Sequence, residues 1–155
     1  MNEQLNEALE DLKRVDHLLY VTLKYTRTID VIQNIVYRLR SSCEFVIGAL
    51  LEHAKKKKIV KTIPASPLMK ISELRKIFPR KDKQTIQNFI NLYSTLRKIE
   101  KAQYLRHGEY RKNVSLIVLG ENKQKELEVT IDLLNEYYKK THEFVEFAVE
   151  YIGRK

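Results

Sequence analysis

The side chains with the clearest chemical potential are the lysines and arginines of residues 55 to 83. This stretch holds eleven basic residues and two acids, so its formal charge of +9 equals the net charge of the whole protein. Cationic side chains that neutralise phosphates bind nucleic acid through counterion release, with little preference for sequence. The stretch is therefore a candidate nucleic-acid or anion-binding site, and its candidate residues are Lys55, Lys56, Lys57, Lys58, Lys61, Arg75, Lys76, Arg80, Lys81 and Lys83.

Two other interpretations fit the same charge pattern. A lysine-rich segment can serve only as a solvated loop that keeps the protein in solution, and a strongly positive field also attracts an acidic protein surface. The salt dependence of RNA binding separates nucleic-acid binding from these interpretations. A nucleic-acid-binding site loses affinity for RNA steeply as salt is added, whereas the other two predict no RNA binding at any salt.

A second group of residues could form a polar pocket if the fold brings two distant segments together. Its candidate members are Asp16, His17, Tyr20, Tyr110, Arg111 and Lys112. Asp16 and Tyr20 are four residues apart, so they share one face of a helix. A guanidinium placed over them would bind an anion. The alternative is a structural role, in which Asp16 pairs with Arg27 or Arg111 and ties the later segment to the helix.

No residue set in the chain specifies a reaction or a bound metal. Cys43 has no second thiol for a disulfide or a zinc site, and we expect it to be a small buried residue. His53, His107 and His142 share no ligand spacing. The sequence also lacks a glycine-rich phosphate loop, a nucleophile elbow and paired carboxylates spaced for acid–base work. We therefore expect no metal, no cofactor and a binding function rather than catalysis.

The elements that must position these residues are predicted to be helices, because hydrophobic residues recur three and four apart and glycine and proline are few. The widest stripe predicts a central helix over residues 30 to 54, with Ile29, Ile32, Val36, Leu39, Cys43, Val46 and Leu50 facing inward. Further helices are predicted over residues 3 to 24, 72 to 78, 83 to 107 and 121 to 152. The sequence thus predicts one domain over residues 1 to 155, an all-α, up-and-down bundle of about five helices with a long basic loop after the second.

Residues 114 to 119 (VSLIVL) are the exception, because they have the pattern of a β-strand. A single strand lacks a ladder partner, so we expect this segment to press against the helices or to pair with a second chain. At the amino terminus, MNEQLNEALEDLKR has no apolar core of a secretion signal, and no apolar run approaches the length of a membrane span. We therefore expect a cytoplasmic location.

Two segments resemble a known family. Residues 11 to 35 (DLKRVDHLLYVTLKYTRTIDVIQNI) and residues 107 to 119 (HGEYRKNVSLIVL) are similar to small archaeal and bacterial members of the HEPN superfamily, whose domains are up-and-down helical bundles. In these proteins an early helix carries a polar cluster like that at Asp16. A Glu-aromatic-Arg-Lys segment, here residues 109 to 112, precedes the last helix.

The resemblance implies a module that binds rather than cleaves. Many HEPN proteins are ribonucleases with an Arg-x4–6-His motif, but at these offsets from Arg111 the chain has Leu116, Ile117 and Val118. What the resemblance then implies is a homodimeric, non-catalytic module that binds RNA, a nucleotide or a partner such as a minimal nucleotidyltransferase, as in toxin–antitoxin pairs. A purely structural interaction protein is the alternative, and a ribonuclease with a rewired site at Tyr110 and Arg111 is a third.

Overall fold

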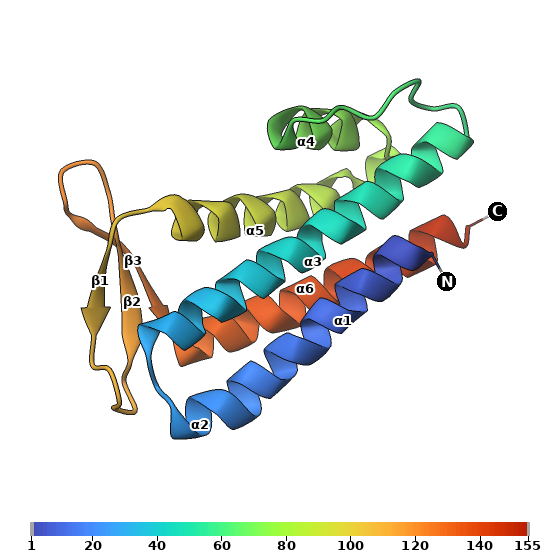
Figure 1. The fold of residues 1–155 in the computed structure, drawn as a ribbon. Coiled ribbons are helices and arrows are strands. Elements are labelled where there is room, and N and C mark those ends of the chain that lie inside the picture. The colour runs from blue at the N-terminus through green and yellow to red at the C-terminus, as the bar shows by residue number, and fades with distance from the viewer. Residues whose placement is uncertain (1, 155) are drawn as a thin grey trace.

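The structure of the protein is a computed structural model that describes residues 2 to 154. Its elements in chain order are α1 (Glu3–His17), a π-helical turn (Leu18–Thr22), α2 (Leu23–Tyr25), α3 (Ile29–Lys56), α4 (Pro67–Lys76), a 3-10 turn (Arg80–Asp82), α5 (Lys83–Lys101), β1 (Tyr104–His107), β2 (Ser115–Leu119), β3 (Lys125–Thr130) and α6 (Ile131–Ile152). The described residues are therefore mostly helical. The long helices α1, α3, α5 and α6 run in alternating directions (Figure 1).

The central element is α3, as its wide apolar stripe predicted. Thr28 caps its first turn, since the Thr28 hydroxyl accepts a hydrogen bond from the Val31 amide at 3.4 Å. Every residue of the predicted stripe, from Ile29 to Leu50, is buried. A stripe this wide needs several neighbours, and α3 contacts α1, α5 and α6 along its length (Figure 1). Cys43 lies in this core, as predicted, and burial raises the pKa of its thiol to about 12.

The helix predicted over residues 3 to 24 is interrupted near its end by a π-helical turn. α1 stops at His17, the π-helical turn follows, and α2 ends at Tyr25. A π turn inserts a residue into a helix, so the faces after it are rotated relative to those before it. The inward residues Leu19 and Leu23 remain buried, while the side chain of Tyr25 is exposed to solvent.

A connector, residues 57 to 82, joins α3 to α5 and contains α4. The short helix predicted over residues 72 to 78 begins earlier, at Pro67, because proline fits the first turn of a helix, where an N–H has no intrahelical partner. Ser72 therefore lies inside α4 and does not cap it. The connector is held to the core by five buried apolar side chains, Val60, Ile71, Leu74, Ile77 and Phe78.

The prediction of an all-α fold is confirmed only in part: the described residues are mostly helical, but they also form a three-stranded antiparallel sheet in the order β1-β2-β3. The predicted strand is the middle one, and its partners come from the same chain: Leu105 faces Ile117 on one side, and Leu116 faces Val129 on the other. β2 therefore has strand partners on both sides without the second chain that was one of the two alternatives. α5 accordingly ends at Lys101, and α6 begins only at Ile131.

The two missed strands have sequences that give weak strand signals. In β3 the residues KELEVT alternate only partly, and Leu127 falls on the helical spacing that continues into α6. In β1 three of the four residues are exposed, so no apolar pattern marks the strand. Among residues 2 to 154, no helix has the length and apolar character required to cross a membrane.

Candidate nucleic-acid interface

The ten candidate cations of the basic stretch gather at the end of the molecule remote from the sheet, and we call this group the lysine end. It is built from the last turn of α3, the connector and the first residue of α5 (Figure 1). All ten residues are exposed. The pKa of His53, on the neighbouring turn of α3, is lowered by burial first and then by the charges of Lys57 and Lys56.

The two acids of the basic stretch do little to neutralise it. Asp82 is buried and is bound by Arg154, whose guanidinium nitrogens lie 2.6 and 3.3 Å from its carboxylate oxygens. This pair raises the pKa of Arg154 and brings in a cation from beyond the end of α6. Glu73 pairs with Lys76 at 3.6 Å. Among residues 2 to 154, no other cation of the lysine end forms an ion pair, so its field is directed toward solvent.

The apolar anchors of the connector fix the lysine end in place. The ring of Phe78 lies 4.7 Å from that of Tyr151 and 5.8 Å from that of Phe147, both on α6. Lys58 adopts a left-handed backbone with φ of 62°, which turns the chain sharply after α3. The cations are thus long, mobile side chains on a backbone that the core holds.

The predicted polar cluster divides between two places in the structure. Asp16 lies at the end of α1 and accepts a long hydrogen bond of 3.5 Å from the hydroxyl of Tyr138 on α6. Burial raises the pKa of Tyr138, and the nearby Asp16 and Tyr20 raise it further. Asp16 also lines a hollow of about 470 Å³ between α1 and α6, together with Tyr138 and His142. Among the residues described, Asp16 pairs with neither Arg27 nor Arg111.

The later half of that cluster lies at the start of α3 instead. The amide of Tyr110 donates to the carbonyl of Arg27 at 2.7 Å. The carboxylate of Glu109 accepts from the amide of Ile29 at 3.1 Å and so caps α3. Tyr110, with the exposed Arg111 and Lys112 beyond it, is therefore held against residues 27 to 29. Sequence reasoning had not given Glu109 this capping role.

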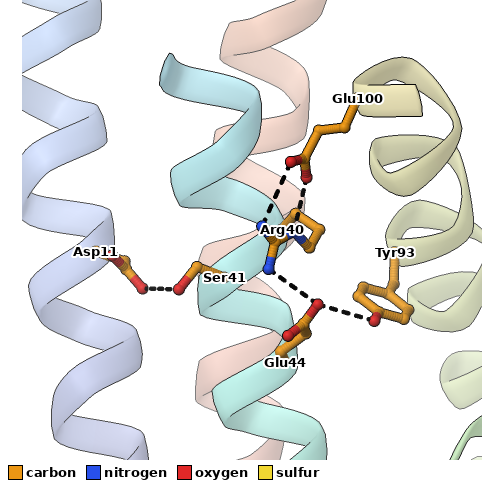
Figure 2. A network of polar contacts seen from close by, with 6 residues as sticks. All are labelled: Asp11, Arg40, Ser41, Glu44, Tyr93 and Glu100. Atoms are coloured by element: carbon orange, nitrogen blue, oxygen red, sulfur yellow. Dashed lines mark hydrogen bonds and ion pairs between the residues drawn. The ribbon is translucent and has the colours of Figure 1, made fainter. Parts of the chain in front are cut away.

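A further polar network links α3 to α1 and α5 (Figure 2). Arg40 on α3 lies between Glu100 on α5 at 2.7 Å and Glu44 on its own helix at 3.0 Å, and Glu44 accepts from the hydroxyl of Tyr93 at 3.1 Å. On the other side of α3, Ser41 donates to Asp11 of α1 at 2.7 Å. These contacts join α3 to α5 and to α1, and we assign them a structural role.

A hollow of about 620 Å³ lies between α5 and α6. Its floor is apolar, with Phe89, Leu92 and Tyr137, and its rim carries amides and hydroxyls such as Asn88 and Thr95. Sequence reasoning missed it, although polar residues at helical spacing on α5 were the available signal. No group of three or more metal-ligating side chains occurs within residues 2 to 154.

Comparisons of the chain with models of known protein families, with curated proteins and with solved structures find no match.

Proposed function

We propose that the protein is a non-catalytic module that binds RNA through its lysine end. One observation carries this proposal: the exposed cations of residues 55 to 83 share this stretch with only two acids, one of which is buried and already bound by Arg154. Elsewhere in the chain basic and acidic residues are equal in number. A surface of this kind attracts a polyanion over a distance and holds it by release of counterions.

The proposal specifies how RNA is held. Eight of the ten cations are lysines, which act as point charges on flexible stems and impose little geometry on a phosphate. The lysine end therefore supports binding to the backbone of RNA rather than to particular bases. Affinity is expected to fall steeply with salt, by a slope of about 0.7 to 0.9 for each phosphate neutralised.

The HEPN resemblance gives this module a biological setting, which is part of the same proposal. Long helices that alternate in direction are compatible with an up-and-down bundle of that superfamily (Figure 1). The chain lacks the Arg-x4–6-His motif, which favours binding over cleavage. Two further predictions come from the resemblance: that the protein forms a homodimer and that it has a nucleotidyltransferase partner. Measurement of the mass of the protein in solution tests the homodimer.

A second candidate function is docking of an acidic protein at the same end. It is favoured by Leu68 and Met69 on α4, whose exposed fractions are 72% and 60%. Apolar side chains amid lysines suit a protein surface better than a phosphate backbone. RNA that fails to bind at low salt would leave this function as the better account.

The test is a salt titration of binding to a fluorescent RNA duplex. The variant Lys56→Ala/Lys57→Ala/Lys61→Ala removes three charges from the lysine end, and Lys101→Ala/Lys139→Ala/Lys140→Ala removes three exposed charges elsewhere. The first is expected to reduce the slope of log K against log salt by about 2 to 3, and the second to leave it unchanged. Equal effects of the two variants, or no binding by the unmodified protein, would contradict the proposal.

A further inference from the structure

The opposite end of the molecule exposes three tyrosine rings. Tyr25 at the end of α2 is 81% exposed, Tyr110 in the β1–β2 loop is 75% exposed, and Tyr20 in the π-helical turn is 52% exposed. Figure 1 shows α2 and the β1–β2 loop side by side at this end, and the hydrogen bond from Tyr110 to Arg27 joins them. We call these three residues, with the cations around them, the tyrosine end.

The cations of the tyrosine end are also unneutralised. The two acids nearest its loop, Asp30 and Glu109, are both bound by Arg106, at 3.3 and 3.4 Å. The remaining cations are Lys24, Arg27, Arg111 and Lys112, and none of these forms an ion pair with another residue of the described chain. The net charge along the sequence does not reveal these cations, because acidic residues of α6 and β3 balance them in the sum over the rest of the chain.

The backbone holds the loop of the tyrosine end in a set shape. Gly108 and Tyr110 both have left-handed conformations, with φ of 63° and 67°. A Cβ at Gly108 would lie 3.0 Å from the side-chain oxygen of Asn113, so glycine suits this turn. A tyrosine with positive φ is uncommon and carries a conformational cost, which the cap of Glu109 on α3 and the bond to Arg27 offset.

From this geometry we infer that the tyrosine end binds unpaired nucleobases, by stacking on Tyr25 and Tyr110 while Arg27 and Arg111 meet the phosphates. Aromatic rings in a positive groove stack any base, because every base has a π face, and arginine adds cation–π contact. The inference rests on the proposed function and deepens it, since it names single-stranded nucleic acid as the ligand of this end.

The two ends are far enough apart to act separately. α3 has 28 residues, which at about 1.5 Å of rise per residue gives about 42 Å between the lysine end and the tyrosine end. A stem held at the lysine end can therefore leave its unpaired strand free to reach the tyrosine end. Duplex RNA alone offers no accessible π faces along its length and would engage the lysine end only.

The experiment compares two probes, a 20-nucleotide single-stranded RNA without self-complementarity and the blunt duplex of the same sequence. The variant Tyr25→Ala/Tyr110→Ala is expected to lower affinity for the single strand about 20-fold or more, because each lost stack costs about 5-fold or more, and to leave duplex affinity within about 2-fold. The variant Tyr25→Phe/Tyr110→Phe should keep both affinities, since phenylalanine also stacks. Tyr37→Ala on α3 is the control, because the guanidinium groups of Arg38 and Arg40 already lie near that ring.

The outcomes separate this inference from the proposed function. Loss of single-strand affinity in the tyrosine variant with no effect of the lysine variant supports the inference and overturns the lysine end as the RNA site. An unchanged single-strand affinity, or equal losses for single strand and duplex, overturns the inference alone. Tyr25→Ala by itself serves if the double variant does not fold, because Tyr25 lies almost wholly outside the core. A DNA strand of the same sequence shows whether the 2′-hydroxyl contributes.

Discussion

The lysine end and the tyrosine end are both positive, but they differ in the kind of side chain that carries the charge. The lysine end has mostly lysines beside exposed aliphatic residues, such as Leu68 and Met69. The tyrosine end has arginines beside exposed tyrosines. Lysine is a mobile point charge, whereas arginine is a planar donor that also stacks. Charge of the same sign therefore does not mean the same recognition, because the tyrosine end also has aromatic rings that can stack on an unpaired base.

The two ends also differ in what holds them. Buried apolar residues such as Phe78 anchor the lysine end, and its cations lie beyond them on flexible stems. Hydrogen bonds from Glu109 and Tyr110 to the start of α3 fix the tyrosine end. Point charges tolerate displacement, whereas stacked rings do not. Removal of an anchoring contact should therefore lower mainly the stability of the fold at the lysine end, and mainly the affinity for RNA at the tyrosine end.

The largest expected effect comes from the scaffold of the lysine end. Phe78→Ala should lower the free energy of unfolding by about 3–5 kcal/mol, because it removes a buried ring that contacts Tyr151 and Phe147. Urea denaturation measures this, with Leu68→Ala on the exposed side of α4 as a control that should change it by less than about 0.5 kcal/mol. Duplex affinity of the folded Phe78 variant should change less than about 3-fold, since the charges remain. A larger loss would show that the lysine end needs exact geometry.

A smaller effect on stability, with a clear effect on binding, is expected at the tyrosine end. Glu109→Ala removes one of the two caps of α3 and one of the two partners of Arg106, so we expect the free energy of unfolding to fall by about 1 kcal/mol. The same variant should weaken binding of single-stranded RNA and spare the duplex. Glu109→Gln keeps an acceptor for Ile29 and should behave more mildly in both measurements. Loss of duplex affinity in either variant would break the contrast between the ends.

The smallest effect concerns the sheet that carries the β1–β2 loop, and it depends on pH. Hydrogen bonds from Lys125 and then Ser115 lower the pKa of Glu128 below its ordinary value of 4.5. A carboxyl with a lowered folded-state pKa stabilises the fold above its unfolded pKa, and this contribution is lost as pH falls through the folded value.

Glu128→Gln should therefore lower Tm slightly at pH 7, and the difference from the unmodified protein should vanish in acid. Thermal melts between pH 7 and pH 3 measure this difference. Glu121→Gln, at an exposed position of the β2–β3 turn, is the control. A difference in Tm for Glu128→Gln that stays constant with pH would show that its charge does not support the sheet.

The sequence by itself determined which residues the long helices bury. Three-and-four spacing gave the inward face of α3 correctly, and the burial of Cys43 was also predicted. It also predicted an exposed basic segment after α3. These features are local, because the period of a helix fixes which side chains share a face.

Only the tertiary structure decided which faces meet and which segments share an end. The sheet was missed because β1 and β3 depend on pairing with β2 rather than on a pattern of their own. Asp16 accepts a hydrogen bond from Tyr138, which lies 122 residues away in the chain. The tyrosine end joins residues 20 to 27 to residues 106 to 112, and no spacing relates them. Spacing encodes the face that a segment buries, whereas the partner of that face is chosen by packing of the whole chain.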